Sequence, residues 1–272
     1  MGISRTTYQY KAKPKDDTEV QDALSSLTTK HVAIGYWQCC YRLWNKGFSW
    51  NHKRIYRVYK QMRLNIRRRA KKRLPERVKH VLTAATAPNQ MWSIDFMSDR
   101  LIDGRKFRVL NIIDDFNRES LAIEIDTSLP ASRVIRVLQR LIEERGLPAN
   151  IRCDNGPEFI SLLLEQWCTD RHITLQFIQP GKPMQNGYIE RKNGSMRREL
   201  LNAYLFNSLN EVRFLCEEWR QDYNTERPHK SLAYLSPTAY AELWEKSPEY
   251  ALSLIHKRRT KSLKIEESRL VD

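Results

Sequence analysis

The chain has 272 residues, a length that fits one or two domains. Apolar residues make up 41% of it and charged residues 29%, which is enough apolar side chain for a core and excludes disorder throughout. Its 47 lysines and arginines outnumber 32 aspartates and glutamates, giving a net charge of +15, so nucleic acid is the leading partner class. With no run of roughly 18 apolar residues and no secretory signal, we expect a cytoplasmic protein that does not bind membranes.

Five cysteines, at positions 39, 40, 153, 168 and 216, include no C-x-x-C pair of the kind that structural zinc sites use. His31, Cys39, Cys40 and His52 superficially suggest a His/Cys zinc site, but adjacent cysteines do not easily both point at one metal. We therefore expect reduced thiols.

Three short helices are expected in residues 1–64. Residues 17–29 follow a cap at Asp17, residues 33–45 form an aromatic-rich apolar run, and residues 51–64 carry an apolar stripe at helical spacing. Two interpretations stay open: a helix-turn-helix-like DNA-binding domain, or a small helical bundle with a solvated basic face. The candidate DNA contacts on the third helix are Lys53, Arg54 and Arg57.

Most of the net charge lies in residues 51–80, where 13 lysines and arginines accompany a single acidic residue, Glu76. Like charges at this density repel one another unless phosphates neutralise them, which favours DNA binding. Residues 65–90 lack hydrophobic periodicity at their end, so we expect a basic linker there. Its candidate DNA contacts are Arg67, Arg68, Arg69, Lys71, Lys72 and Arg73.

From residue 91 onward the pattern becomes that of an α/β domain. Strands are expected at 91–97, 107–113 and 120–125, and antiparallel pairing of these consecutive strands is the economical arrangement. There follow a helix at 131–145, a strand at 150–153, a helix near 159–168, a strand at 174–178 and a helix from about residue 186. This order predicts a mixed sheet flanked by helices, with residues 91–205 as the core and residues 206–272 as a helical extension.

Three carboxylates are notable for their positions in these elements. Asp95 lies within the first strand, where a buried carboxylate needs a partner, and Asp154 follows the fourth strand, at an end where α/β proteins bind ligands. Glu190 falls on the helix after the loop that contains Lys182, and it can meet the other two only if this helix lies across the sheet. Taken without their sequence contexts, the three fit a structural carboxylate, a turn residue and a surface charge.

The nearest competitors of these carboxylates are Asp114, Asp115 and Glu158. Asp114 and Asp115 end a strand, and Glu158 lies four residues after Asp154. Turn and helix-start roles account for them.

The sequence around the three carboxylates resembles the DDE transposases of bacterial insertion sequences, which share the retroviral-integrase-like catalytic core. The matching contexts are Trp92-Ser93-Ile94-Asp95, Cys153-Asp154-Asn155-Gly156 and Asn186-Gly187-Tyr188-Ile189-Glu190-Arg191, with 35 residues between Asp154 and Glu190. The C-terminal signature of that group is matched by Trp219, Tyr223-Asn224, Arg227-Pro228-His229, Ser231-Leu232 and Ser236-Pro237. The resemblance covers residues 30–241 and is to the type made from two reading frames, of which this chain looks like the downstream-frame product.

The resemblance implies an RNase H-like fold in which Asp95, Asp154 and Glu190 are catalytic and hold two Mg²⁺ ions, with Mn²⁺ as a possible substitute. Hard oxygen ligands suit Mg²⁺, and two cations about 3.5–4 Å apart stabilise the attacking and leaving oxygens of an in-line displacement. Arg197, seven residues after Glu190, matches the basic position of the group and is expected to contact phosphate. Lys182 is the second candidate DNA contact in this domain.

We therefore expect a transposase that cleaves DNA at insertion-sequence ends and transfers the strands to target DNA. It would act on double-stranded DNA as a homo-oligomer, with an upstream-frame protein as a further partner. Two alternatives stay open: a catalytically inactive DNA-binding regulator of transposition, and an RNase H-like nuclease without strand transfer. Tyr223, Arg227 and His229 fit packing and DNA docking about equally well.

Overall fold

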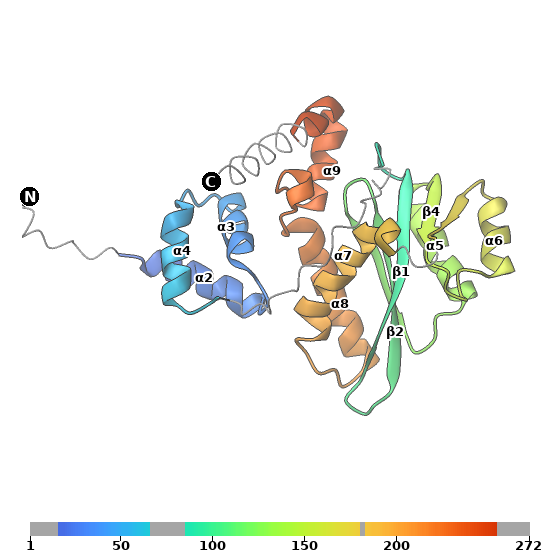
Figure 1. The fold of residues 1–272 in the computed structure, drawn as a ribbon, viewed down its shortest axis with the longest axis horizontal. Coiled ribbons are helices and arrows are strands. Elements are labelled where there is room, and N and C mark those ends of the chain that lie inside the picture. Colours follow the sequence, from blue (N-terminus) through green and yellow to red (C-terminus); the bar gives the residue numbers. More distant parts are fainter. Residues whose placement is uncertain (1–15, 66–84, 180–182, 255–272) are drawn as a thin grey trace, which may run out of the picture. The chain divides into compact units, whose positions relative to one another are not determined.

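A computed structural model of the chain describes residues 16–65, 85–179 and 183–254 (Figure 1). The chain divides into two compact units, Met1–Arg69 and Ala70–Asp272. The expected linker contacts from Arg67 to Arg73, and Lys182, lie outside the described residues. Among the helices that are described, none has both the length and the apolar character needed to cross a membrane.

Residues 16–65 of the first unit form three helices, α2 (Thr18–Lys30), α3 (Tyr36–Asn45) and α4 (His52–Gln61), close to the positions expected from the sequence. Their core is built from residues at helical spacing. The side chain of Asn51 accepts the backbone N–H of Lys53 and so caps α4. The main buried side chains are Val20, Leu24, Leu27, Cys39, Cys40, Leu43, Ile55, Val58 and Tyr59.

The second unit is built on a five-stranded sheet with the order β3-β2-β1-β4-β5. Strands β1 (Met91–Arg100), β2 (Lys106–Asp114) and β3 (Ser120–Asp126) pair in antiparallel fashion. Strands β4 (Asn150–Cys153) and β5 (Thr174–Phe177) add to β1 in parallel. The mixed sheet and its consecutive antiparallel strands confirm the sequence prediction.

Helices cover both faces of this sheet. The residues of β1 and β2 that pack against α5 (Ala131–Arg145) and α6 (Leu162–Thr169) include Trp92, Ile94, Leu110 and Ile112. The opposite face packs against three successive segments, α7 (Gly187–Met196), the π-helical turn η2 (Arg197–Leu201) and α8 (Leu209–Thr225), through a second apolar cluster. Since side chains alternate along a strand, Asp95 lies on the face that α7 and α8 cover. Other described elements of this unit include the 3₁₀ turns η1 (Pro183–Asn186) and η3 (Lys230–Leu232), and α9 (Pro237–Lys246).

Two local expectations were wrong. Helix α6 begins at Leu162, capped by the side chain of Ser161, so Glu158 lies in the preceding turn and not at a helix start. Asp17 occupies the N-cap position of α2, but its side chain makes no capping bond. Its carboxylate instead accepts hydrogen bonds from Arg54 and Arg57 of α4, because two guanidinium groups are stronger partners than one backbone N–H.

Candidate active site

Asp95 and Asp154 are brought together by the pairing of β1 with β4. This pairing is parallel and places Ser93 opposite Arg152. Asp95 lies two residues after Ser93, and Asp154 lies two residues after Arg152. The two carboxylates therefore lie on the same face and at the same level of the sheet. Asp154 comes directly after the end of β4, and its Oδ1 accepts the backbone N–H of Gly156 at 3.0 Å.

Helix α7 lies along β1, as the convergence of the three carboxylates requires. Before Glu190, Asn186 donates its side-chain amide to the carbonyl oxygen of Ile94 (3.3 Å). After it, the Asn193 amide donates to Asp95 Oδ2 (2.7 Å). Since residues three and four apart share a helix face, Glu190 lies on the face that these two contacts turn toward β1. Its side chain is exposed.

The electrostatics of the site show that Asp95 is influenced by the other two carboxylates. Burial, with the nearby charges of Asp154 and Glu190 adding to it, raises the pKa of Asp95 to about 6. Hydrogen bonds from the Phe96 backbone N–H and from Asn193 act in the opposite direction. Partial burial also raises the pKa of Glu190. Because the charges of Asp154 and Glu190 disfavour the ionised form of Asp95, a cation bound beside Asp95 would be favoured.

The donor set consists of carboxylate oxygens, which are the ligands that Mg²⁺ and Mn²⁺ prefer. In the conformation of the described residues, however, no three His, Cys, Asp or Glu side chains are gathered closely enough to hold a metal ion. Cys39 and Cys40 are buried free thiols, and burial raises the pKa of Cys39 to about 12 and that of Cys40 to about 11.

Beneath Asp95 lies a chain of polar side chains that the sequence did not reveal. Asn193 accepts a hydrogen bond from the side-chain amide of Asn111 (2.8 Å), and Asn111 in turn accepts one from Lys192 Nζ (2.6 Å). Lys192 is 1% exposed, and burial lowers its pKa to about 7. The one available signal was that Asn111 interrupts the apolar run of β2.

The competing carboxylates have structural partners instead. Asp114 is buried and accepts the backbone N–H groups of Asn89 and Phe116, which is the turn role expected for it. Asp115 is buried beside Arg152, with 2.7 Å between its Oδ2 and the guanidinium. Glu158 pairs with Arg108, which holds the pKa of this carboxyl below its usual range.

Several candidate DNA contacts are already engaged within the chain. Arg197 donates to Asp99 (2.6 Å) and to the carbonyl oxygen of Ser98. Arg54 and Arg57 are held by the half-buried Asp17. Lys53 is exposed. In this conformation Arg197, Arg54 and Arg57 stabilise the packing of neighbouring elements, and their contact with phosphate stays a prediction.

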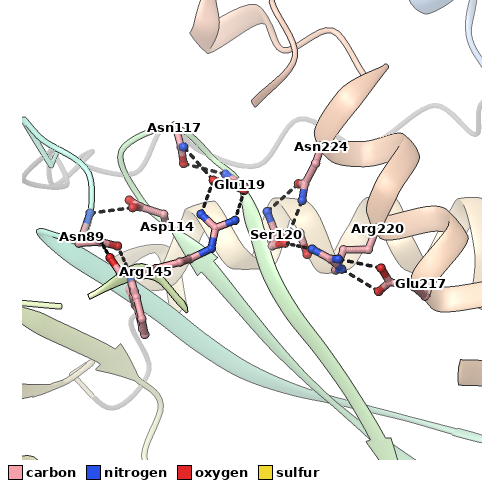
Figure 2. Close-up of polar contacts among 10 residues, drawn as sticks. Asn89, Asp114, Asn117, Glu119, Ser120, Arg145, Glu217, Arg220 and Asn224 are labelled. Atoms are coloured by element: carbon pink, nitrogen blue, oxygen red, sulfur yellow. Dashed lines mark hydrogen bonds and ion pairs between the residues drawn. The ribbon is translucent and has the colours of Figure 1, made fainter. Parts of the chain in front are cut away.

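The C-terminal signature residues tie α8 to the rest of the second unit. Arg227 pairs with Glu199 of η2, and its guanidinium lies over the ring of the buried Tyr223. Tyr223 also packs edge-on against His229, with 4.8 Å between ring centroids. Figure 2 shows the neighbouring contacts, in which Asn224 reaches the backbone of Ser120 at the start of β3. These contacts favour the packing interpretation of Tyr223, Arg227 and His229.

Comparison with known proteins defines first a fold and then a family. A chain of the solved intasome of simian T-cell lymphotropic virus, in complex with a PP2A regulatory subunit, superposes with a TM-score of 0.52. It is 18% identical, and the match covers 80% of this chain and 73% of that one, so the likeness shows the fold alone. The fold is RNase H-like, as the sequence predicted.

Residues 85–183 and 171–237 match integrase core domain families. The uncharacterized 31.7 kDa protein of insertion element IS407 from Burkholderia multivorans is 41% identical, with 89% of this chain and 87% of the relative covered. The uncharacterized 39.2 kDa protein of insertion element IS476 from Xanthomonas euvesicatoria is 37% identical, with 88% and 70% covered. The chain therefore belongs to the integrase core family, as a transposase of bacterial insertion sequences.

Proposed function

We propose that the chain catalyses divalent-metal-dependent cleavage of DNA at insertion-element ends and the transfer of those ends to target DNA, with Asp95, Asp154 and Glu190 as its catalytic residues. The observation that supports this proposal most is the meeting of β1, the end of β4 and α7, since the charges of Asp154 and Glu190 act on the Asp95 carboxyl. Membership of the integrase core family supports the type of reaction.

The three carboxylates would hold two Mg²⁺ ions, with Mn²⁺ as a substitute. Bound there, the cations would supply charge stabilisation to the attacking and leaving oxygens of a phosphodiester. The chain itself orients Asp95, whose oxygens accept hydrogen bonds from the Phe96 backbone N–H and from the Asn193 amide. The exposed side chain of Glu190 has the freedom to complete the set.

Two displacements at phosphorus make up the proposed reaction. In the first, a water oxygen bonds to phosphorus at the element end, the bond to the 3′ oxygen breaks, and that oxygen takes up a proton. In the second, the freed 3′ hydroxyl attacks a target phosphodiester and loses its proton, while a target 3′ oxygen leaves. Both steps need a positioned phosphate and no covalent bond to the protein.

Double-stranded DNA is the proposed partner, held by the basic residues of the first unit and of the linker. Lys53 is a candidate phosphate contact because it is exposed, and Arg197 becomes one if it leaves Asp99. Each of the two element ends has to undergo both successive reaction steps, which favours a homo-oligomer on DNA, with the upstream-frame protein as an additional partner. Such an enzyme would work in the bacterial cytoplasm.

The test is an assay of end cleavage and end joining with the full chain, a duplex that carries the ends of its own insertion element, and a supercoiled target. We expect both activities with Mg²⁺ or Mn²⁺, binding without reaction in Ca²⁺, and no reaction in EDTA. Asp95→Asn and Asp154→Asn should abolish both activities. Cleavage without joining would indicate the nuclease, and binding without either would indicate the inactive regulator.

A further inference from the structure

Lys192 is a fully enclosed basic side chain directly beneath the candidate active site. Its ammonium donates to Asn111 Oδ1 and lies 5.9 Å from the centre of the Trp219 ring. In the part of the chain that the structure describes, no ion pair joins it to a carboxylate. Burying an unpaired ammonium is costly, so a neutral side chain of similar shape would make a more stable core. The position calls for an explanation beyond packing.

The hydrogen bonds that lead from Lys192 to Asp95 run in one direction. Lys192 Nζ donates to Asn111 and an ionised carboxylate is only an acceptor, whereas an Asn amide is one of each. Lys192 therefore obliges Asn111 to turn its oxygen toward the ammonium and its NH₂ toward Asn193. Asn193 must then present its own NH₂ to Asp95, as the three contacts of 2.6, 2.8 and 2.7 Å show.

We propose that Lys192 is a positioning residue that, through Asn111 and Asn193, fixes the orientation of the Asp95 carboxylate for cation binding. This inference rests on the proposed function, because it takes Asp95 as a cation ligand. With Asn193 on Oδ2 and the Phe96 backbone N–H on Oδ1, both oxygens of Asp95 are held from the protein side. Their remaining lone pairs are left for ligands on the side of Asp154 and Glu190.

The direction of these hydrogen bonds depends on the donor at the end of the chain. Without Lys192, both amides could rotate by 180° and exchange donor for acceptor. Asn193 would then turn its oxygen toward Asp95, where two acceptors repel each other. Hydrogen-bonded neighbours that orient metal ligands in this way typically change metal affinity by about 10- to 100-fold when they are removed.

The first test compares Lys192→Met with the wild-type chain and with Cys216→Ala. Met keeps an unbranched stem without the donor, and Cys216 is a buried neighbour on α8 that takes no part in the hydrogen-bonded chain. We expect Lys192→Met to bind Mn²⁺ about tenfold more weakly by calorimetry, with its circular dichroism unchanged. Cys216→Ala should keep wild-type Mn²⁺ affinity whatever its melting temperature. An unchanged affinity in folded Lys192→Met would overturn the proposal.

A second measurement needs no metal. In chain labelled with ¹⁵N-asparagine, the side-chain amide signals of Asn111 and Asn193 should shift and exchange faster in Lys192→Met, and stay in place in Cys216→Ala. The double variant Lys192→Met/Asn193→Ala should bind Mn²⁺ no more weakly than Asn193→Ala, because both changes break the same chain. Amide signals that do not respond to Lys192→Met, or additive losses of Mn²⁺ affinity, would contradict the proposed role of the hydrogen-bonded chain. Absence of Mn²⁺ binding by the wild type would instead refute the proposed function. The amide signals would still show whether Lys192 orients Asn111 and Asn193.

Discussion

Asn224 hydrogen-bonds both backbone polar groups of Ser120, a residue 104 positions earlier in the chain. Its Oδ1 accepts the Ser120 N–H at 2.8 Å, and its Nδ2 donates to the Ser120 carbonyl oxygen at 3.0 Å (Figure 2). The side chain thus takes the place of a neighbouring strand at the start of β3, which is an edge strand of the sheet. An edge strand that is covered in this way no longer offers free backbone groups for pairing.

Asn224→Ala should therefore destabilise the second unit. Arg220 also donates to the Ser120 carbonyl oxygen, so the loss falls mainly on the Ser120 N–H, which is left buried. A buried unpaired donor costs about 1–3 kcal/mol. We expect a decrease of this size in the free energy of unfolding measured with urea. Gln221→Ala, an exposed change on the same helix, should stay within about 0.5 kcal/mol of wild type; equal losses in the two variants would contradict this role of Asn224.

Asp95 should make the stability of the metal-free protein depend on pH. Its pKa is raised, mainly by burial, to about 6 from an ordinary 3.8, so between these values the folded chain binds more protons than the unfolded chain. Stability from this group therefore falls as the pH rises from about 4 through 6. Asp95→Asn cannot ionise, so it should match wild type near pH 4 and exceed it at pH 7.5 by up to about 3 kcal/mol.

Urea unfolding in EDTA at pH 4 and pH 7.5 measures this difference. Mg²⁺ at pH 7.5 should then stabilise the wild type and leave Asp95→Asn unaffected, because a cation favours the ionised carboxylate. If the two proteins differ by the same amount at both pH values, the carboxylate is not buried in the way the structure describes.

Much of the fold could be predicted from the sequence, because the apolar periodicity of β1 to β3 and of α5 depends on local residues. The neighbourhood of Asp95 and Asp154 also followed, since the ends of sheet strands are predictable places for ligands. The partners of buried polar groups were not predictable. Lys192 and Asn111 lie 81 positions apart, and their meeting depends on how α7 packs on β2. The ion pairs of Asp17 with Arg54 and Arg57 likewise depend on how α2 packs against α4.

Those ion pairs predict that the basic residues of α4 divide into two kinds. Lys53 and Lys60 are exposed, so replacing both with Ala should flatten the salt dependence of DNA affinity by about 1.8 in log K against log salt, with the melting temperature unchanged. Arg54→Ala/Arg57→Ala should lower the melting temperature and change the slope less. Fluorescence anisotropy at salt concentrations between about 50 and 200 mM measures the slope for both double variants. A larger change of slope in the arginine variant would mean that DNA displaces Asp17 from these residues.

Glu190→Gln tests the residue whose place in the site depends most on tertiary structure. The change keeps size and hydrogen-bonding capacity but removes the charge that would help to hold a cation. Because the Glu190 side chain is exposed and the contacts of Asn186 and Asn193 hold α7 in place, folding should survive. Loss of one contribution to transition-state stabilisation typically lowers the rate by about 10²–10³.

We expect end cleavage and joining by Glu190→Gln to fall by at least that factor, while DNA affinity, for which we propose that the basic residues of the first unit and linker are mainly responsible, stays within a few-fold. Glu165→Gln is the matched control, because Glu165 is an exposed glutamate on α6, the helix that packs on the opposite face of the sheet. It should equal wild type in both assays. Near wild-type cleavage and joining by Glu190→Gln would show that α7 does not supply the third carboxylate, and Asp95 and Asp154 would then need another partner.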